Sequence, residues 1–328
     1  MKRAIITGIE ASLPDYVLTN DELSTMVETS DEWIMSHTGI KERRILKVEG
    51  EGTSYMGADA VNKLLAATGT SPDEVDMLIC ATTSPDMPFP ATANIISDKC
   101  GIHNAWGYDI NAGCSGFIFS FTTAASFVES GRAKKIVLVC GEKMSSITDY
   151  TDRTTCPLFG DAAVAMLVEP TDDMSIGLQD SVLHVDGIGR NYLYQYAGGS
   201  AHPASHETVD GHKHFVYQNG QVVFKHAVTN MADVSVKIME RNNLSADDIA
   251  YLIPHQANLR IIDATGRRMG LSTDKILIDI EKFGNTAGTS IPLALWDFKD
   301  KFKKGDALVF SAFGAGFTWG SLYYRWAY

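Results

Sequence analysis

The sequence predicts an α/β fold made of two similar halves. One ten-residue pattern occurs twice, as SPDEVDMLIC at 71–80 and as SADDIAYLIP at 245–254. Each copy opens with Ser, carries two adjacent acidic residues and then a β-branched residue, and reaches a Leu-Ile pair after two further residues. Two copies with so long a period indicate a duplicated unit and not a solenoid. We therefore expect the halves to be residues 1–172 and 173–328.

The elements of the halves follow in a similar order. The first half has a strand-like N-terminus, MKRAIITGIEASLP, and then helix, strand, helix and strand candidates at 56–69, 71–80, 115–130 and 130–143. The second half has the corresponding candidates at 234–243, 245–254, 289–302 and 302–314. Strands that alternate with helices predict βαβ units and largely parallel, buried sheets. Functional residues in such sheets gather beyond the carboxyl ends of the strands.

Composition excludes several classes of function. The 328 residues are 45% hydrophobic and carry a net charge of −12, which argues against nucleic acid as the main partner. No apolar run approaches the roughly 18 residues that a membrane helix needs. The apolar N-terminal stretch is broken by Gly8 and Glu10, so we interpret it as a strand and not as a signal peptide. We expect a cytoplasmic protein that does not bind membranes.

One of the cysteines has an unusual setting. The chain has five: Cys80, Cys100, Cys114, Cys140 and Cys156. Their number is odd and none form a C-x-x-C pair, so we expect neither a zinc site nor a disulfide framework. Cys114 alone is flanked by glycines, and it precedes a helix candidate. A helix N-terminus favours thiolate, so we predict a pKa below about 8.5 and a nucleophilic role; a buried structural cysteine is the alternative.

A histidine stands at the end of the second repeated strand. That strand ends at Pro254, so His255 lies at a site-forming position and matches Ala81 or Thr82 of the first half. The alternative is an ordinary core or surface histidine. The His-rich stretch HPASHETVDGHKH at 202–214 has irregular spacing and no cysteine, so we predict a surface loop there and no metal.

An asparagine completes the set of candidates. Asn285, in KFGNTAGTSIP, precedes a helix candidate much as Cys114 does in the other half. A simple helix cap is the alternative, because Asn and Thr are good caps. Chance would rarely place a Cys, a His and an Asn at equivalent or adjacent strand ends of two duplicated halves, so we predict that Cys114, His255 and Asn285 act together.

These residues lie in motifs that resemble the thiolase superfamily, most closely its β-ketoacyl-[acyl-carrier-protein] synthase III family. The resemblance covers nearly the whole chain and implies a thiolase-like duplicated fold with αβαβα layers. The motifs, in family order, are TNDELSTMVETSDEWIMSHTGIKERRI, ATTSPDMPFPATA, NAGCSGF, TDRTTCPLFGDAA, GQVVFKHAV, PHQANLRII, GNTAGTSIP and FGAGFTWGS.

The resemblance implies a decarboxylative Claisen condensation without a cofactor. Cys114 would take an acyl group from a short-chain acyl-CoA, as an acyl-enzyme. Malonyl-acyl-carrier protein would then lose carbon dioxide, with His255 and Asn285 stabilising the enolate oxygen. Backbone N–H groups of Cys114 and Ala315 would form the oxyanion hole; family members commonly have Gly at position 315. The product would initiate fatty-acid synthesis, or alternatively supply a specialised metabolite or polyketide starter.

The resemblance also implies substrate contacts. Trp33 and Arg153 would hold the adenine of CoA between them, with ordinary packing as the alternative for Trp33. Phe224 and Asn258 would line the pantetheine tunnel. His37 stands where well-studied members often carry Arg, which puts a phosphate contact there in doubt.

Three further expectations concern the acyl group and protein partners. Phe89 would close the end of the acyl pocket near the interface of a homodimer, and Phe313 would lie close to the nucleophile. A helix at 260–269 would place Arg260, Arg267 and Arg268 on its outer side, opposite Ile261, Ile262, Thr265 and Met269. Together with Lys225 this stripe would attract an acidic carrier protein, unless it is only a solvated face.

Related classes fit less well. A degradative thiolase would need a second active cysteine near the C-terminus, but the last cysteine is Cys156. Elongating synthases normally use two histidines, and the second position here is Asn285. A non-catalytic chain-length factor would lack Cys114, and a Cys-His-Asn hydrolase of another fold would not explain the duplication.

Overall fold

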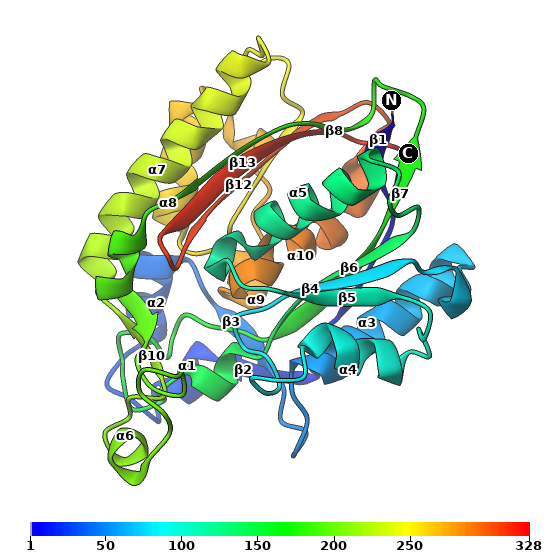
Figure 1. Ribbon diagram of the computed structural model, residues 1–328. Helices are drawn as coiled ribbons and strands as arrows, with labels where there is room; N and C mark the ends of the chain where they lie inside the picture. The colour runs from blue at the N-terminus through cyan, green and yellow to red at the C-terminus, as the bar shows by residue number, and fades with distance from the viewer. Residues whose placement is uncertain (1) are drawn as a thin grey trace.

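The computed structural model describes residues 2–328 and has two main sheets with helices between and outside them (Figure 1). The first sheet contains, in spatial order, β1 (Arg3–Ser12), β7 (Ala162–Thr171), β6 (Ile136–Glu142), β4 (Met77–Ala81) and β5 (Trp106–Ile110). The second contains β11 (Tyr251–Pro254), β12 (Ala307–Gly314), β13 (Thr318–Arg325) and β8 (Gly177–Val185). The prediction of an α/β protein with two similar sheets is confirmed.

The two sheets share one pattern of strand directions. β4 and β6 run parallel, as do β11 and β12, and antiparallel strands complete each sheet on one side. The sheets differ at the opposite edge: β5 pairs with β4 over five residues, whereas its counterpart is a single parallel bridge between Leu252 and Ile276. β7 ends at Thr171 and β8 begins at Gly177, so the chain passes from the first sheet to the second between these residues.

Helices form the three other layers (Figure 1). The middle layer is α5 (Gly116–Glu129) with α10 (Ser290–Asp297), and α5 contacts strands of both sheets. The outer layer on the first sheet is α3 (Thr53–Thr68) with α4 (Thr92–Lys99); that on the second is α7 (Gly220–Arg241) with α8 (Leu259–Arg268). The layered αβαβα arrangement is therefore confirmed.

The layers explain the apolar runs in the sequence. Every residue of β4 and β6 is buried, because helices cover both faces of the sheet. α5 is apolar along most of its length, since it fills the space between the sheets and contributes Phe117 and Phe121 to the main core. That core includes residues of both halves, for example Ile79 and Phe310.

Short elements surround the edge where the strands end. They are α1 (Asn20–Leu23), α2 (Asp31–Thr38), α6 (His206–Asp210), α9 (Ile280–Phe283) and two small sheets, β2 (Tyr16–Thr19) with β3 (Glu42–Ile45) and β9 (Leu193–Gln195) with β10 (Val216–Gln218). The His-rich stretch at 202–214 belongs to this periphery and contains α6; its predicted loop is therefore partly helical.

Candidate active site

Cys114 lies in a tight turn between β5 and α5. A 3-10 turn spans Gly113–Ser115, and α5 begins at Gly116. Gly113 has a φ of +56°, and a Cβ on it would lie 2.7 Å from the backbone nitrogen of Ala315. A side chain at position 113 would therefore collide with the segment that follows β12. The glycine before Cys114 is required by both conformation and space.

The environment of the thiol contradicts our prediction of a lowered pKa. Burial, with a smaller contribution from the nearby Glu142, raises the pKa of Cys114 to about 12, and the backbone N–H groups of Cys114 and Ala315 act in the opposite direction. Cys114 retains partial solvent access but packs against Phe159 and Ala287. The prediction was wrong because it counted the helix end and not desolvation.

His255 is held by a hydroxyl from the middle layer. Its Nδ1 lies 2.7 Å from Oγ of Ser290, the first residue of α10, and its backbone N–H donates to the carbonyl of Ser311. The same Ser290 oxygen accepts the backbone N–H of Gln256 at 3.3 Å. The serine proton is then available for Nδ1, which leaves the histidine proton on Nε2. Burial lowers the pKa of His255 to about 3, so the ring is neutral at pH 7.

Asn285 orients its amide through its own turn. Its Oδ1 accepts the backbone N–H of Ala287 at 2.9 Å. Its Nδ2 has no hydrogen-bond partner among residues 2–328, so both amide protons are available to a ligand. The side chain thus does more than cap a helix, because the turn fixes its oxygen and leaves the donors free.

Packing brings the three candidates to one place. The turn at 285–290 carries Asn285 and the Ser290 that contacts His255. The same turn abuts the Cys114 turn: a Cβ on Gly288 would lie 3.2 Å from the carbonyl oxygen of Gly113. The carboxyl ends of β5 and β11, together with the turn between α9 and α10, therefore bring Cys114, His255 and Asn285 to the interface between the two halves.

The expected correspondence between Cys114 and Asn285 is off by three residues. The Oδ1 of Asn111 accepts the N–H of Gly113, just as that of Asn285 accepts the N–H of Ala287. Gly113 and Ala287 both have positive φ, +56° and +47°. Asn285 is therefore the equivalent of Asn111, and the position equivalent to Cys114 is Gly288.

Glu142 is a buried acid at this interface that our sequence reasoning missed. It ends β6, is fully buried, and accepts hydrogen bonds from the backbone and side chains of Thr83 and Ser84. Burial raises its pKa to about 7. A charged residue at the end of the apolar run KIVLVCGEK was the available signal. Ser290 gave no signal beyond its place at a helix start.

The predicted oxyanion donors lie side by side. A Cβ on Gly314 would lie 2.4 Å from the backbone nitrogen of Cys114, so β12 ends directly against the nucleophile turn. Ala315 follows at once, and its N–H is one of the groups that lower the pKa of the thiol. Phe313 is buried beside Phe317 in the same region.

Trp33 and Arg153 are also brought together. The guanidinium carbon of Arg153 lies 5.4 Å from the ring centroid of Trp33, and the ring of His37 stacks on Trp33 with a centroid distance of 4.4 Å. Asn258 has both ends of its amide engaged: it donates to the carbonyl of His37 and accepts the N–H of Arg260. It therefore links α2 to the start of α8.

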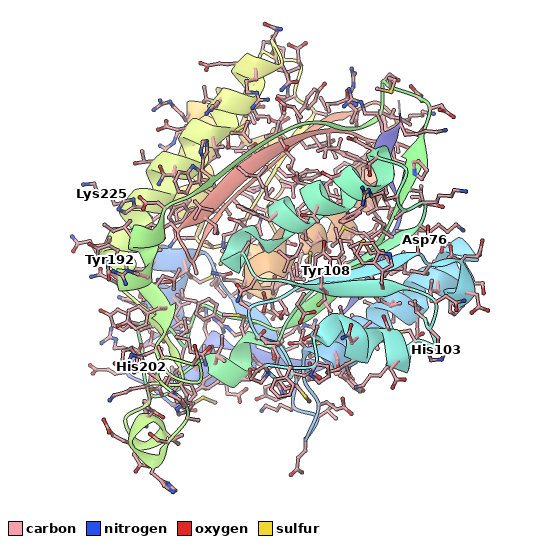
Figure 2. All side chains as sticks on the ribbon, in the orientation of Figure 1. Asp76, His103, Tyr108, Tyr192, His202 and Lys225 are labelled. Atoms are coloured by element: carbon pink, nitrogen blue, oxygen red, sulfur yellow. The ribbon has the colours of Figure 1, made fainter. Side chains whose placement is uncertain are left out.

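The amphipathic prediction for α8 is confirmed. Ile261, Ile262, Thr265 and Met269 are buried, whereas Arg260, Arg267 and Arg268 are exposed. The arginines are not all free: Arg268 pairs with Asp233 on α7, and Arg260 stacks over Phe224 at 4.9 Å. Lys225 is exposed on the outer side of α7 (Figure 2).

Phe89 does not lie in a pocket of its own chain. It is 84% exposed, and the loop residues on either side of it are exposed as well. The base of this loop is nevertheless fixed, because Asp86 accepts the backbone N–H and hydroxyl of Ser54. The loop is anchored at its base and projects an apolar tip.

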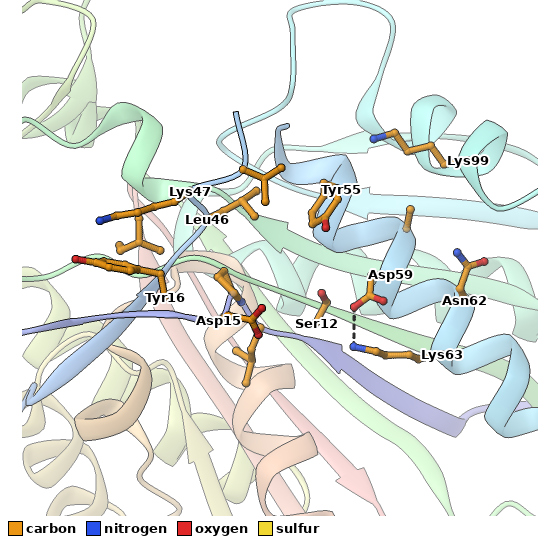
Figure 3. A pocket seen from close by; sticks show the side chains of 15 residues that line it. Ser12, Asp15, Tyr16, Leu46, Lys47, Tyr55, Asp59, Asn62, Lys63 and Lys99 are labelled. Carbon is orange, nitrogen blue, oxygen red and sulfur yellow. Dashed lines mark hydrogen bonds and ion pairs between the residues drawn. The ribbon is translucent and has the colours of Figure 1, made fainter. Parts of the chain in front are cut away.

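A polar cavity of about 730 Å³ lies elsewhere (Figure 3). It is lined by the loop after β1, the end of β3 and the outer side of α3, and none of the predicted site residues line it. Its basic groups are already engaged: Lys63 pairs with Asp59, Lys99 pairs with Glu51, and Lys47 lies over the ring of Tyr16. It has no part in the chemistry at Cys114.

Two further kinds of feature, a membrane-spanning helix and a cluster of metal ligands, are absent from residues 2–328. None of the helices is long and apolar enough to cross a membrane. No group of three or more His, Cys, Asp or Glu side chains converges as a metal site would require.

Comparison with known proteins identifies the family. Residues 108–187 match the family model described as 3-oxoacyl-[acyl-carrier-protein] synthase III, and residues 239–326 match its C-terminal model. The β-ketoacyl-[acyl-carrier-protein] synthase III 2 of Bacteroides thetaiotaomicron is 52% identical over 325 residues, which cover 99% of this chain and 97% of that protein.

Solved structures agree with the sequence matches. The Thermus thermophilus synthase III is 37% identical, has a TM-score of 0.90, and the match covers 98% of this chain and 99% of that one. The priming β-ketosynthase of the R1128 polyketide pathway is 29% identical with a TM-score of 0.90, covering 99% and 97%. On these matches over nearly its full length, the chain belongs to the β-ketoacyl-[acyl-carrier-protein] synthase III family.

Proposed function

We propose that Cys114, His255 and Asn285 carry out the reaction of this family in the present chain. The chain is an acyltransferase that condenses an acyl-CoA with malonyl-acyl-carrier protein and so initiates fatty-acid synthesis. The observation that carries the assignment of residues is the contact between the Cys114 turn and the turn at 285–290, which also holds His255. We further propose a cytoplasmic enzyme whose only small-molecule requirement is its substrates.

The first half-reaction transfers the acyl group to Cys114. The sulfur attacks the thioester of acyl-CoA, the bond to the CoA sulfur breaks, and the thiol proton is balanced by the proton that CoA takes up on leaving. Since burial raises the pKa of Cys114 to about 12, the resting enzyme holds a thiol. The N–H groups of Cys114 and Ala315 favour charge on the sulfur and then on the carbonyl oxygen, an effect worth about 2.7–4 kcal/mol per donor.

The second half-reaction uses the donors of the other half. Malonyl-acyl-carrier protein loses carbon dioxide, and the electron pair of the broken bond passes to the thioester oxygen as an enolate. Neutral His255 donates through Nε2, because Ser290 occupies Nδ1, and Asn285 donates through Nδ2. The carbanion then attacks the acyl group on Cys114, the bond between the acyl carbon and the sulfur breaks, and the released thiolate takes a proton from water to restore the thiol.

We propose that the adenine end of CoA binds between Trp33 and Arg153. The Arg153 guanidinium lies over the Trp33 ring and both side chains reach solvent, which supports a contact with a flat aromatic ring; the 5.4 Å gap must widen for that ring to enter between them. Phe224 and Asn258 would line the path from there to Cys114, although Asn258 already links α2 to α8. His37 stacks against Trp33, so we propose that it holds the Trp33 ring in place and does not contact a phosphate.

We propose a homodimer in which Phe89 of one subunit closes the acyl pocket of the other. An 84% exposed phenylalanine on an anchored loop calls for a partner. β5 supports the same interface, since it is an edge strand whose outer side lacks a neighbour within residues 2–328 and carries a half-exposed Trp106. Phe313 would line the same pocket from inside.

We propose that Lys225, Arg260, Arg267 and Arg268 attract the acidic carrier protein. Arg267 and Lys225 are exposed and make no salt bridge among the described residues, so their charges are available to a partner. The pairing of Arg268 with Asp233 weakens its contribution. The stripe would act mainly on the encounter rate.

The test of this function separates its two halves. Purified protein is incubated with acyl-CoAs of different chain length, and intact-mass spectrometry records covalent loading of Cys114. Malonyl-acyl-carrier protein is then added, and the β-ketoacyl product is measured. We expect loading by short primers followed by formation of a carbon–carbon bond. Thioester hydrolysis without condensation would contradict the proposal.

A further inference from the structure

Arg43 is a buried arginine that the reaction does not use directly. It is fully buried in β3, and no carboxylate among residues 2–328 forms an ion pair with it. Its Nε is buried without a hydrogen-bond partner, as is the hydroxyl of the nearby Tyr150. Burying an unpaired charge is expensive, and replacing it with an apolar residue would often stabilise a protein. Arg43 therefore has a role other than general stability.

The guanidinium joins three segments that are distant in sequence. Nη1 donates to the carbonyl of Leu18 at 3.0 Å, and Nη2 donates at 2.8 Å both to Oδ1 of Asn20 and to the carbonyl of Pro157. Only a planar fork of several donors can reach all three acceptors at once; a lysine ammonium on a flexible stem cannot. Arg43 thus connects the end of β2 and the start of α1 to the loop after Arg153.

Asn20 extends the connection to the helix that carries Trp33. Its Nδ2 donates at 2.8 Å to Oδ1 of Asp31, the first residue of α2, and at 2.8 Å to the carbonyl of Ile40 just beyond that helix. A continuous chain of hydrogen bonds therefore runs from α2 through Asn20 and Arg43 to Pro157. Trp33 lies two residues after Asp31, and Arg153 lies four residues before Pro157.

We propose that Arg43 is a positioning residue that sets the spacing of Trp33 and Arg153 and thereby the affinity for acyl-CoA. This inference rests on the proposed contact of these two residues with CoA. Without the shared guanidinium, α2 and the loop at 151–157 would be joined by apolar packing alone, in the cluster that holds Ile34 and Cys156, because no other hydrogen bond among residues 2–328 joins Asn20 or α2 to that loop. The 5.4 Å separation of the pair would then no longer be fixed.

The loading half-reaction gives the cleanest test. The segment that holds Pro157 also pairs with the catalytic turn, since Gly160 donates to the carbonyl of Asn285. Overall turnover would therefore mix two effects, whereas loading of Cys114 does not require Asn285. In Arg43→Lys we expect the KM for acyl-CoA in loading to rise about tenfold, as when one charge-assisted hydrogen bond is lost, with the maximal loading rate changed less than twofold.

A double-mutant cycle distinguishes this inference from the proposed function. Trp33→Ala should raise the same KM, and adding Arg43→Lys to it should cause no further rise, because Arg43 acts through the pair. If Trp33→Ala has no effect, the CoA contact itself is wrong. If Trp33→Ala raises KM but Arg43→Lys does not, or if the two effects add fully, the CoA contact stands and the inference about Arg43 is overturned.

Two further variants guard against loss of folding. Arg44→Lys is the matched control, because Arg44 is the next residue of β3 and donates only to the carbonyl of Pro14, at 3.4 Å; its KM should match wild type. Asp31→Ala removes the hydrogen bond from Asn20 to the first residue of α2. Asp31 is exposed, and this variant should also raise the KM for acyl-CoA. An unchanged KM in Asp31→Ala would count against the inference even if Arg43→Lys fails to fold.

Discussion

The two halves of the molecule share a scaffold but differ in what they place at its most confined point. Each half enters its middle-layer helix through an Asn whose oxygen binds the N–H two residues on and a residue with positive φ. In the first half the next position is Cys114, and in the second it is Gly288. The thiol therefore has no side-chain counterpart across the interface.

A second difference between the halves accompanies the one between Cys114 and Gly288. β12 ends in Gly314, which leaves room for the Cys114 turn, whereas β6 ends at the equivalent position in Glu142. A Cβ on Gly288 would lie 3.6 Å from a carboxylate oxygen of Glu142. One half thus gives space to a nucleophile, and the other fills the matching space with an acid. The duplicated fold builds one site where symmetry would allow two.

The largest expected effect comes from removing the nucleophile. Cys114→Ser should reduce condensation by roughly a thousandfold or more, because no strong base is present to ionise a serine hydroxyl. Adding Gly288→Cys to this variant should not restore activity. Beside Gly288, Glu142 occupies the space equivalent to the one that Gly314 leaves open for Cys114. Product assays with purified protein measure both, and substantial activity in either would break the comparison.

Substitutions at the two residues with positive φ in these turns, Gly113 and Ala287, should have effects of very different size. In Gly113→Ala the new Cβ would lie 2.7 Å from the nitrogen of Ala315, so the turn must shift and acyl loading should fall about 10–100-fold. In Ala287→Gly the strained φ of +47° is relieved, at the cost of a more flexible unfolded chain, so the free energy of unfolding should change by less than about 1 kcal/mol. If Ala287→Gly lost as much acyl loading as Gly113→Ala, the difference in available space would not distinguish the two turns.

The charge of Glu142 should be visible in the pH dependence of Cys114. As the pH rises through about 7, Glu142 ionises and raises the pKa of the thiol. Glu142→Gln should therefore shift the pH profile of Cys114 alkylation to lower pH, by about one unit. A profile identical to wild type would show that the carboxylate does not act on the thiol.

Glu142 also has a consequence for stability. Its pKa is raised in the folded protein, so the stability contributed by its proton is complete below its ordinary value of 4.5 and is lost as the pH rises through about 7. This part of the pH dependence of the free energy of unfolding should disappear in Glu142→Gln, as chemical denaturation at several pH values would reveal.

The smallest expected effect concerns the outer side of the second half. Replacing Arg260, Arg267 and Arg268 with Glu should raise the apparent KM for malonyl-acyl-carrier protein several-fold and spare acyl-CoA loading. Exposed charges act over about 8 Å at physiological salt, so higher salt should narrow the difference from wild type. Normal use of the carrier protein at low salt would mean that the stripe is only a solvated face.

The sequence was sufficient for features that depend on periodicity. The repeat at 71–80 and 245–254 predicted β4 and β11 as corresponding strands of the two sheets. The spacing of apolar residues predicted the buried side of α8. The position of His255 at the end of a strand followed from the same repeat. These features are local, or are copied from one half to the other.

Features that depend on contacts between segments distant in the sequence were not accessible in this way. The pKa of Cys114 is set by desolvation and by Glu142, which is 28 positions away in the sequence. The three-residue offset between Cys114 and Asn285 was missed although NAG at 111–113 and NTA at 285–287 share their Asn, because only the fold shows that both asparagines bind the N–H two residues on. Arg43 resembled a surface charge in KERRI, and only the folded chain brings Leu18, Asn20 and Pro157 around it.

The division of chemistry between the halves is tested most directly by measuring both half-reactions in the same variants. His255→Ala and Asn285→Ala are each mixed with acyl-CoA, and intact mass gives the rate of loading on Cys114. Malonyl-acyl-carrier protein is then added, and release of carbon dioxide is recorded. We predict loading within about threefold of wild type and decarboxylation reduced about 10²–10³-fold, the effect of losing one preorganised donor. Equal losses in the two half-reactions would contradict the account.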